Sequence, residues 1–114
     1  MAFTDVAKDS MLNSRFVEKE VYVGLFNSTG EVTASEYKRI KIPFSQSEKG
    51  QIINEKDIFF DIAKSSWGVI DSVGLFDSLQ EGELLGEMEP EYKKFIDAGT
   101  QFFIPKGMAI ARLI

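Results

Sequence analysis

Short apolar runs separated by turn-forming residues recur along most of this 114-residue chain. From residue 20 onward they follow one another at a spacing of roughly 8–12 residues, and several alternate with a period of two. Strands this short and close together leave no room for the helical crossovers that parallel sheets need. We therefore predict an all-β fold, either an antiparallel β-sandwich or a jelly-roll-like barrel, behind a short N-terminal α-helix. The expected strands cover residues 20–26, 36–44, 52–53, 58–62, 68–76, 83–88, 94–96, 101–105 and 108–114.

A helical pattern is confined to the N-terminal stretch. Its apolar side chains recur at spacings typical of an amphipathic helix, at Phe3, Val6, Met11, Leu12 and Phe16. Because the strand pattern is complete from residue 20 onward, we predict a helical arm over residues 1–17 and a single β-sandwich domain over residues 20–114. The apolar face of the arm packs either on its own domain or on a neighbouring molecule, so these side chains are candidate partner contacts.

The tetrapeptide Val-Gly-Leu-Phe occurs twice, at residues 23–26 and 73–76, followed each time by Asn-Ser or Asp-Ser. Each copy places a glycine inside an expected strand, where glycine is unfavourable unless a bulge or a close approach requires it. We expect two neighbouring core strands that a bulky side chain crosses closely, with Trp67 as the candidate. The predicted structural core positions are Gly24, Phe26, Trp67, Gly68, Gly74 and Phe76.

The chain contains neither cysteine nor histidine. This excludes disulfides, thiolate and imidazole metal sites, and Ser-His or Cys-His catalysis. We accordingly predict no catalytic residue, no cofactor and no metal ligand. The net charge is −5, with 11 acidic and 4 basic side chains in residues 51–100, so nucleic acid is not an expected partner. No apolar run reaches the roughly 18 residues of a transmembrane helix, so no membrane partner is expected.

Two charged clusters remain. We interpret the acidic one as a solvated loop, with a weak divalent-ion site as the alternative, because apolar residues interrupt the spacing that calcium ligands need. We interpret the basic one, Lys38, Arg39 and Lys41, as a solvated strand face, with contact to an acidic partner as the alternative. The acidic cluster is Glu81, Glu83, Glu87, Glu89 and Glu91.

Phenylalanine is abundant, and four of these residues form the adjacent pairs Phe59-Phe60 and Phe102-Phe103. Neighbouring residues of a strand point to opposite faces, so one member of each pair can fill the core while the other needs a different cover. The N-terminal helix or a second copy of the chain can supply this cover, and we predict that a second copy or another partner does so. Aromatic side chains that stack on carbohydrate are the alternative.

The order of motifs resembles a family of small tailed-bacteriophage virion proteins, described as tail fibre or minor structural proteins. The resemblance runs from about residue 3 to residue 114. After the N-terminal helix it includes Tyr22–Phe26, then Glu31-Val32 with Tyr37 and Arg39, then Ser66–Val69 leading into Val73–Asp77. Gly82–Leu85, Asp97–Gly99 and Phe103–Gly107 follow in the family's order. The family has no catalytic residues to transfer, and the stretch after the first Val-Gly-Leu-Phe is shorter here, at residues 27–30.

The resemblance implies a non-enzymatic virion structural protein that works through protein–protein contacts. Two virion locations remain open: a tail or tail-fibre component, and a capsid-associated decoration or head-fibre-base protein. We predict a homo-oligomer, with a trimer favoured because fibre-like virion proteins commonly resemble threefold assemblies, and contacts with other virion proteins. A carbohydrate-binding module for host-surface adsorption is the alternative. Because the N-terminal stretch lacks the features of a signal peptide, we expect folding in the host cytoplasm before assembly into the virion.

Overall fold

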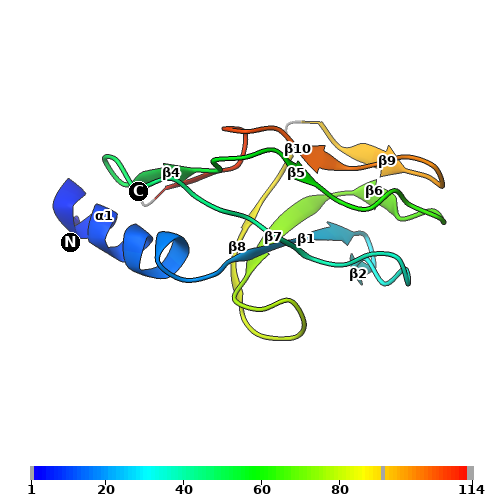
Figure 1. Cartoon of the computed structure of the whole chain (residues 1–114), viewed down its shortest axis with the longest axis horizontal. Coiled ribbons are helices and arrows are strands. Elements are labelled where there is room, and N and C mark those ends of the chain that lie inside the picture. The colour runs from blue at the N-terminus through cyan, green and yellow to red at the C-terminus, as the bar shows by residue number, and fades with distance from the viewer. Residues whose placement is uncertain (1, 91, 113–114) are drawn as a thin grey trace. The chain divides into compact units, whose positions relative to one another are not determined.

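The structure is a computed structural model that describes residues 2–90 and 92–112. The helix α1 (Asp5–Leu12) is capped at its N-terminus by Thr4, whose hydroxyl accepts a hydrogen bond from the Ala7 N–H. A π-helical turn over Asn13–Val17 continues it. The remaining regular elements are strands, so the predicted antiparallel β fold with a short N-terminal helix is confirmed (Figure 1). Within the described ranges these strands form open sheets and no closed barrel.

The largest sheet has five strands. They are β1 (Tyr22–Asn27), β2 (Gly30–Glu31), β3 (Ile40–Lys41), β7 (Ser72–Phe76) and β8 (Leu84–Met88). The hydrogen-bonded order is β2-β1-β7-β8, and β3 also pairs with β1. All four strand pairings in this sheet are antiparallel.

Three further sheets have two strands each. β4 (Gln51–Ile53) pairs with β11 (Ile110–Arg112), and β6 (Gly68–Ile70) pairs with β9 (Lys94–Ile96), both antiparallel. β5 (Ile58–Phe59) pairs with β10 (Phe103–Ile104). The described strands are shorter than the sequence predicted at 58–62 and 101–105, and the strand predicted at 108–114 begins only at Ile110, with residues 113–114 lying outside the described residues.

The predicted strand over residues 36–44 is wrong for most of its length. Only Ile40–Lys41 is a strand, because the Tyr37 N–H donates to the Ala34 carbonyl oxygen and closes a turn. This turn interrupts the alternation that the sequence suggested. As a result, Arg39 is only 8% exposed and does not belong to a solvated face.

The chain forms two compact units. Unit 1 contains residues 1–20, 42–58 and 104–114, and unit 2 contains residues 21–41 and 59–103. Within unit 1 the helix is fixed by Asp9, whose carboxylate accepts hydrogen bonds from the Ser47 hydroxyl and the Gly50 N–H, both at 2.7 Å. The predicted division into an arm at 1–17 and one domain at 20–114 stays a prediction, which a truncation experiment tests below.

Unit 2 contains the buried apolar side of the largest sheet. Val23 and Leu25 on β1 lie opposite Leu75 and Val73 on β7, and all four side chains are buried. The period of two within each Val-Gly-Leu-Phe copy places these branched side chains on one face. The opposite face carries the glycines and phenylalanines, and the candidate functional site is built there.

Candidate functional site

The two Val-Gly-Leu-Phe strands pair so that Gly24 lies directly opposite Gly74. The Phe26 and Phe76 rings stack on this face with centroids 5.9 Å apart and planes 20° apart. A Cβ atom at Gly74 would lie 2.6 Å from Phe26 Cε2 and 2.9 Å from Leu84 Cδ1. The glycines are therefore required by packing: they leave the space that the aromatic rings occupy.

Trp67 does not cross the glycine pair, contrary to the expectation from the sequence. The atoms nearest to a Cβ at Gly24 belong to Glu31, Tyr37 and Phe76. Trp67 lies elsewhere in unit 2, 2% exposed, with its ring edge-to-face on Tyr37 at a centroid distance of 5.6 Å. The bulky groups over the two glycines are phenylalanine rings and a polar cluster.

Glu36 fixes Trp67 through one carboxylate oxygen. Its Oε2 accepts hydrogen bonds from Trp67 Nε1 at 2.9 Å and from the Lys64 N–H at 2.8 Å. The Ser65 N–H and hydroxyl also donate to this oxygen. These hydrogen bonds, with that from Trp67 the largest effect, lower the pKa of Glu36 to about 2. Glu36 therefore acts as an ionised bridge that holds residues 64–67.

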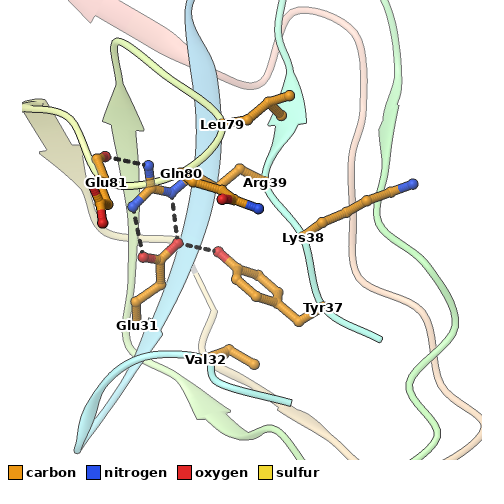
Figure 2. A pocket seen from close by; sticks show the side chains of 8 residues that line it. All are labelled: Glu31, Val32, Tyr37, Lys38, Arg39, Leu79, Gln80 and Glu81. Atoms are coloured by element: carbon orange, nitrogen blue, oxygen red, sulfur yellow. Dashed lines mark hydrogen bonds and ion pairs between the residues drawn. The ribbon is translucent and has the colours of Figure 1, made fainter. Parts of the chain in front are cut away.

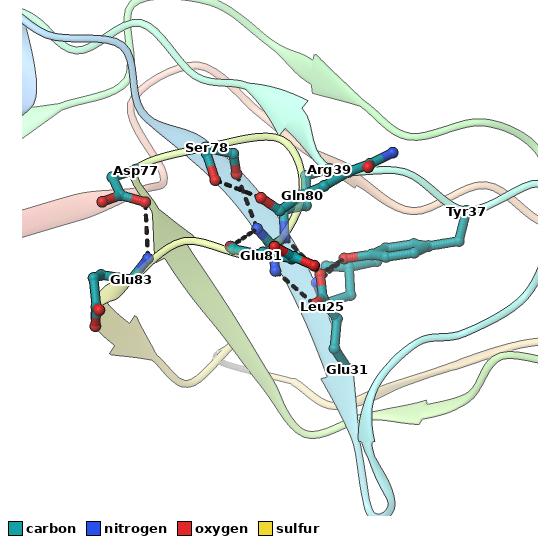
Figure 3. Close-up of polar contacts among 9 residues, drawn as sticks. All are labelled: Leu25, Glu31, Tyr37, Arg39, Asp77, Ser78, Gln80, Glu81 and Glu83. Atoms are coloured by element: carbon teal, nitrogen blue, oxygen red, sulfur yellow. Dashed lines mark hydrogen bonds and ion pairs between the residues drawn. The ribbon is translucent and has the colours of Figure 1, made fainter.

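A polar cluster of Glu31, Tyr37 and Arg39 covers the glycine side of β1 (Figure 3). Arg39 donates from Nε to Glu31 Oε2 and from Nη2 to Glu31 Oε1, both at 2.9 Å, which is a bidentate ion pair. The Tyr37 hydroxyl donates to Glu31 Oε2 at 2.7 Å and accepts from the Leu25 N–H at 2.9 Å. The Arg39 guanidinium also lies 3.5 Å from the centroid of the Phe76 ring.

The cluster fixes the protonation state of each member. Burial opposes ionisation of Glu31, but the hydrogen bonds from Arg39 and Tyr37 outweigh it and hold the pKa of Glu31 below its ordinary value. Burial, followed by the hydrogen bond to Glu31, raises the pKa of Tyr37. The hydrogen bond to Glu31 raises the pKa of Arg39. Glu31 is thus a carboxylate, Tyr37 is a neutral phenol and Arg39 is a cation, and each is hydrogen-bonded within the cluster.

Arg39 also holds the loop over residues 77–83. Its Nη1 donates to the main-chain oxygens of Ser78 at 2.9 Å and Glu81 at 2.7 Å. The Glu83 N–H donates to Asp77 Oδ1 at 2.8 Å and closes the loop from the other side. Gly82 has a φ of +72°, and a Cβ there would collide with Asp77 and Ser78, so the turn requires glycine.

A hollow of about 390 Å³ lies beside this cluster (Figure 2). Of the predicted basic cluster, Lys38 and Arg39 line it, and Lys38 Nζ lies 3.9 Å from an exposed Asp61 carboxylate. The interpretation of Lys38, Arg39 and Lys41 as one solvated face is therefore wrong for Arg39, which is buried in an ion pair. The lining residues are Glu31, Val32, Tyr37, Lys38, Arg39, Leu79, Gln80 and Glu81.

The described part of the acidic cluster is exposed. Among residues 2–90 and 92–112, no group of three or more acidic side chains is arranged to hold a metal ion. The exposed members are Glu81, Glu83, Glu87 and Glu89, while Glu91 lies outside the described residues.

Some of the candidate partner contacts lie in the interior. Leu12, Phe60 and Phe102 are buried within the chain and are not accessible to a partner. Phe16 is half-buried and packs edge-to-face on Phe44 with centroids 6.3 Å apart. The set of candidate contacts that remain exposed therefore narrows to Phe3, Val6, Met11, Phe59 and Phe103.

One apolar pair stands out on the surface. Phe59 is 53% exposed, Phe103 is 42% exposed, and their rings stack with centroids 5.6 Å apart. Their neighbours Phe60 and Phe102 pack edge-to-face, with centroids 5.9 Å apart, in the interior. Strand alternation thus separates each Phe-Phe pair into an inner and an outer ring, as the sequence predicted.

Sequence reasoning missed the ion pair between Glu31 and Arg39. The sequence signal for this ion pair is the spacing of Glu31-Val32, Tyr37 and Arg39, residues that also carry the family resemblance. A tyrosine and an arginine two residues apart share a face if the segment is extended, and a glutamate nearby can bind both. The acceptors on Ser78 and Glu81 are main-chain oxygens, so no side-chain pattern marks them.

Residues 2–90 and 92–112 contain no helix with the length and apolar character that a membrane span requires.

Comparison with known proteins identifies the family. No curated protein matches the chain. A family model described as "Podophage GP4 fiber I protein gp80" matches residues 9–111, which is most of the chain. This match confirms the predicted resemblance to phage fibre and structural proteins, and the chain belongs to the podophage GP4 fiber I protein gp80 family.

Proposed function

We propose that this protein is a non-enzymatic structural component of a bacteriophage fibre that works by binding other protein surfaces. Membership of the fibre family supports a structural role in the virion. The polar cluster is consistent with such a role, because Glu31, Tyr37 and Arg39 bind one another and the 77–83 loop. Each has a fixed protonation state, so the cluster supplies neither a free base nor a free nucleophile.

The observation that carries the proposal is the exposed Phe59–Phe103 stack. About half of the surface of each of these residues is exposed, although a phenylalanine gains roughly 1.5–3 kcal/mol when it is fully buried. Paired aromatic side chains are typical anchors of protein interfaces. We propose that this pair is covered by another copy of the chain, in a trimer, or by another virion protein. The site of attachment is either the tail, including its fibres, or the capsid.

Sedimentation equilibrium at tens of micromolar tests the self-association. We expect the wild type to associate and the double variant Phe59→Ser/Phe103→Ser to be a monomer that still unfolds cooperatively, at a urea midpoint lowered by the loss of the ring stack. Leu79→Ser is the matched control, because Leu79 is equally exposed but lies in the 77–83 loop. A monomeric wild type refutes self-association, and imaging of labelled protein on purified particles then tests attachment to other virion proteins.

Carbohydrate binding is the second candidate function, and the same pair favours it. Two stacked rings with the Lys94 ammonium 5.6 Å from the Phe103 centroid resemble a sugar-stacking platform. Glycan-array binding that the Phe59→Ser/Phe103→Ser variant loses would support this function. An array without signal for the wild type would exclude it for the glycans tested.

A further inference from the structure

The largest sheet ends at β8. In the order β2-β1-β7-β8, this strand pairs with β7 on one side only, and no strand within residues 2–90 and 92–112 pairs with its other side. The open side of such a strand presents main-chain N–H and C=O groups that another chain can pair with. An open edge alone does not identify a partner, so two further properties of β8 matter.

The first property is a glycine that the fold of this chain does not explain. Gly86 lies in the middle of β8, where glycine weakens a strand. Unlike Gly24 and Gly74, it has no atom of the described residues, apart from its chain neighbours, within 4 Å of the position where a Cβ would be. Its φ is not in the left-handed region, so the bulge between its partner Leu75 and Phe76 does not require glycine either.

Glycine in a strand commonly marks a place where another backbone or a ligand approaches closely. The other strand glycines each have a structural reason within this chain. Gly24 and Gly74 have atoms close to the position of a Cβ, and Gly30 and Gly68 have a positive φ. The space over Gly86 therefore lies open on one face of the sheet, where a side chain of an added strand could pack. This space lies on the strand that also has the open edge.

The second property is the charge of the edge. Glu83, Glu87 and Glu89 are all exposed along and beside β8, and no basic side chain lies in residues 83–89. A second copy of β8 placed against this edge would bring glutamates against glutamates, which disfavours self-pairing. A basic strand would instead be attracted, and a whole-chain charge of −5 acts in the same direction.

We propose that β8 is a docking edge for an extended, basic segment of another virion protein, which adds to the sheet as a strand and places one of its side chains over Gly86, as Phe26 of β1 does over Gly74 of β7. Main-chain hydrogen bonds give such strand addition its affinity, and side-chain complementarity gives it specificity. This inference deepens the proposed function and rests on it, because it names the chemistry of one partner of the fibre protein.

Titration of the ¹⁵N-labelled full chain with synthetic peptides tests the docking edge. The probe is an amidated octapeptide of alternating lysine and valine. The controls are an alternating glutamate–valine octapeptide and an alternating lysine–proline octapeptide, which has the same charge but cannot donate the hydrogen bonds of a strand. We expect the lysine–valine peptide alone to shift the amide signals of residues 84–88. Equal shifts with the lysine–proline peptide would show charge attraction without strand addition and would overturn the proposal.

Two variants locate the site. Gly86→Val adds a branched side chain whose Cβ meets no atom of the described residues within 4 Å, so we expect the fold to persist and peptide binding to be lost. Glu87→Lys reverses one edge charge, and we expect about tenfold weaker binding of the lysine–valine peptide. Glu55→Lys is the matched control, because it makes the same exposed charge reversal in unit 1 and should leave binding unchanged. Binding that survives Gly86→Val would overturn the proposal.

The outcome for β8 is separable from that for the proposed function. If the wild type is present on purified particles and the lysine–valine peptide leaves the signals of residues 84–88 unchanged, the docking edge is wrong and the structural role stands. If the protein is absent from particles, the proposed function fails whatever the peptide does. Association of the chain with itself through β8 would appear as concentration-dependent shifts at residues 84–88 without peptide, and would overturn the choice of a basic partner.

Discussion

Substitution of Gly74 by alanine should destabilise the protein far more than its size suggests. The added methyl group would lie 2.6 Å from Phe26 Cε2 and 2.9 Å from Leu84 Cδ1, so the Phe26 ring must move away from the strand. Overpacking of this kind costs about 1–3 kcal/mol. Separation of the Phe26–Phe76 stack adds about 0.5–1.5 kcal/mol. We expect a total loss of about 2–4 kcal/mol, a large part of the roughly 5–15 kcal/mol of a typical domain.

Urea unfolding followed by the fluorescence of Trp67 measures this loss, since Trp67 is the chain's one tryptophan and is 2% exposed. The midpoint should fall by about 1–2 M for a protein of this size. Gly86→Ala is the matched control, because its Cβ meets no atom within 4 Å, and it should be neutral or stabilising by up to about 1 kcal/mol. A loss below about 0.5 kcal/mol for Gly74→Ala, or equal losses for both variants, would refute the packing explanation.

A double-mutant cycle adds a second check. If the steric conflict lies with Phe26, the combination of Gly74→Ala with Phe26→Ala should cost clearly less than the sum of the two single changes. Strict additivity of the two changes would place the conflict elsewhere, at Leu84 or in the backbone.

Three further predictions concern the polar contacts and the helix. Arg39→Met leaves Glu31 without its cation and should lower the free energy of unfolding in urea by about 2–4 kcal/mol. Arg39→Lys keeps the charge but not the bidentate geometry, and it should lower this free energy by less. Equal losses for the two variants would refute this explanation of the ion pair. The depressed pKa of Glu36, about 2, means that its contribution to stability is present above its ordinary pKa near 4.5 and is lost as pH falls through about 2. The urea midpoint should therefore decline over this pH range less steeply in Glu36→Gln than in the wild type, and identical slopes would contradict the assignment. Deletion of residues 1–17 removes the exposed Phe3, Val6 and Met11 and should weaken the association that Phe59 and Phe103 carry. Cooperative unfolding should persist at a lower midpoint, because Asp9 no longer holds Ser47 and Gly50; a chain that fails to fold would place the helix in the core.

Local periodicity carried most of what the sequence could predict. The two Val-Gly-Leu-Phe strands were expected to be neighbours, and they pair glycine against glycine. Such a prediction succeeds because the alternation of apolar and small residues is fixed by the backbone itself. The inner and outer members of the Phe59-Phe60 and Phe102-Phe103 pairs were predictable for the same reason.

Long-range polar partners were not predictable. Arg39 follows Lys38 and precedes Lys41 in an expected strand, and these three basic residues therefore suggest a solvated strand face. The burial of Arg39 depends on a turn closed by Ala34 and on a carboxylate at Glu31, eight residues before Arg39. The division into two compact units is also non-local, since each unit combines separate stretches of the chain. Neither property has a periodic signal.

The way Arg39 holds the 77–83 loop has a consequence for sequence variation. The guanidinium binds the main-chain oxygens of Ser78 and Glu81, and these atoms are present whatever side chains the loop carries. Leu79 and Gln80, which lie between the two acceptors and are exposed, can therefore change without altering the path of the loop. A fibre protein built in this way can acquire new surface chemistry at two adjacent positions while its scaffold stays constant, which makes residues 79–80 a natural place for diversification and for an inserted epitope tag.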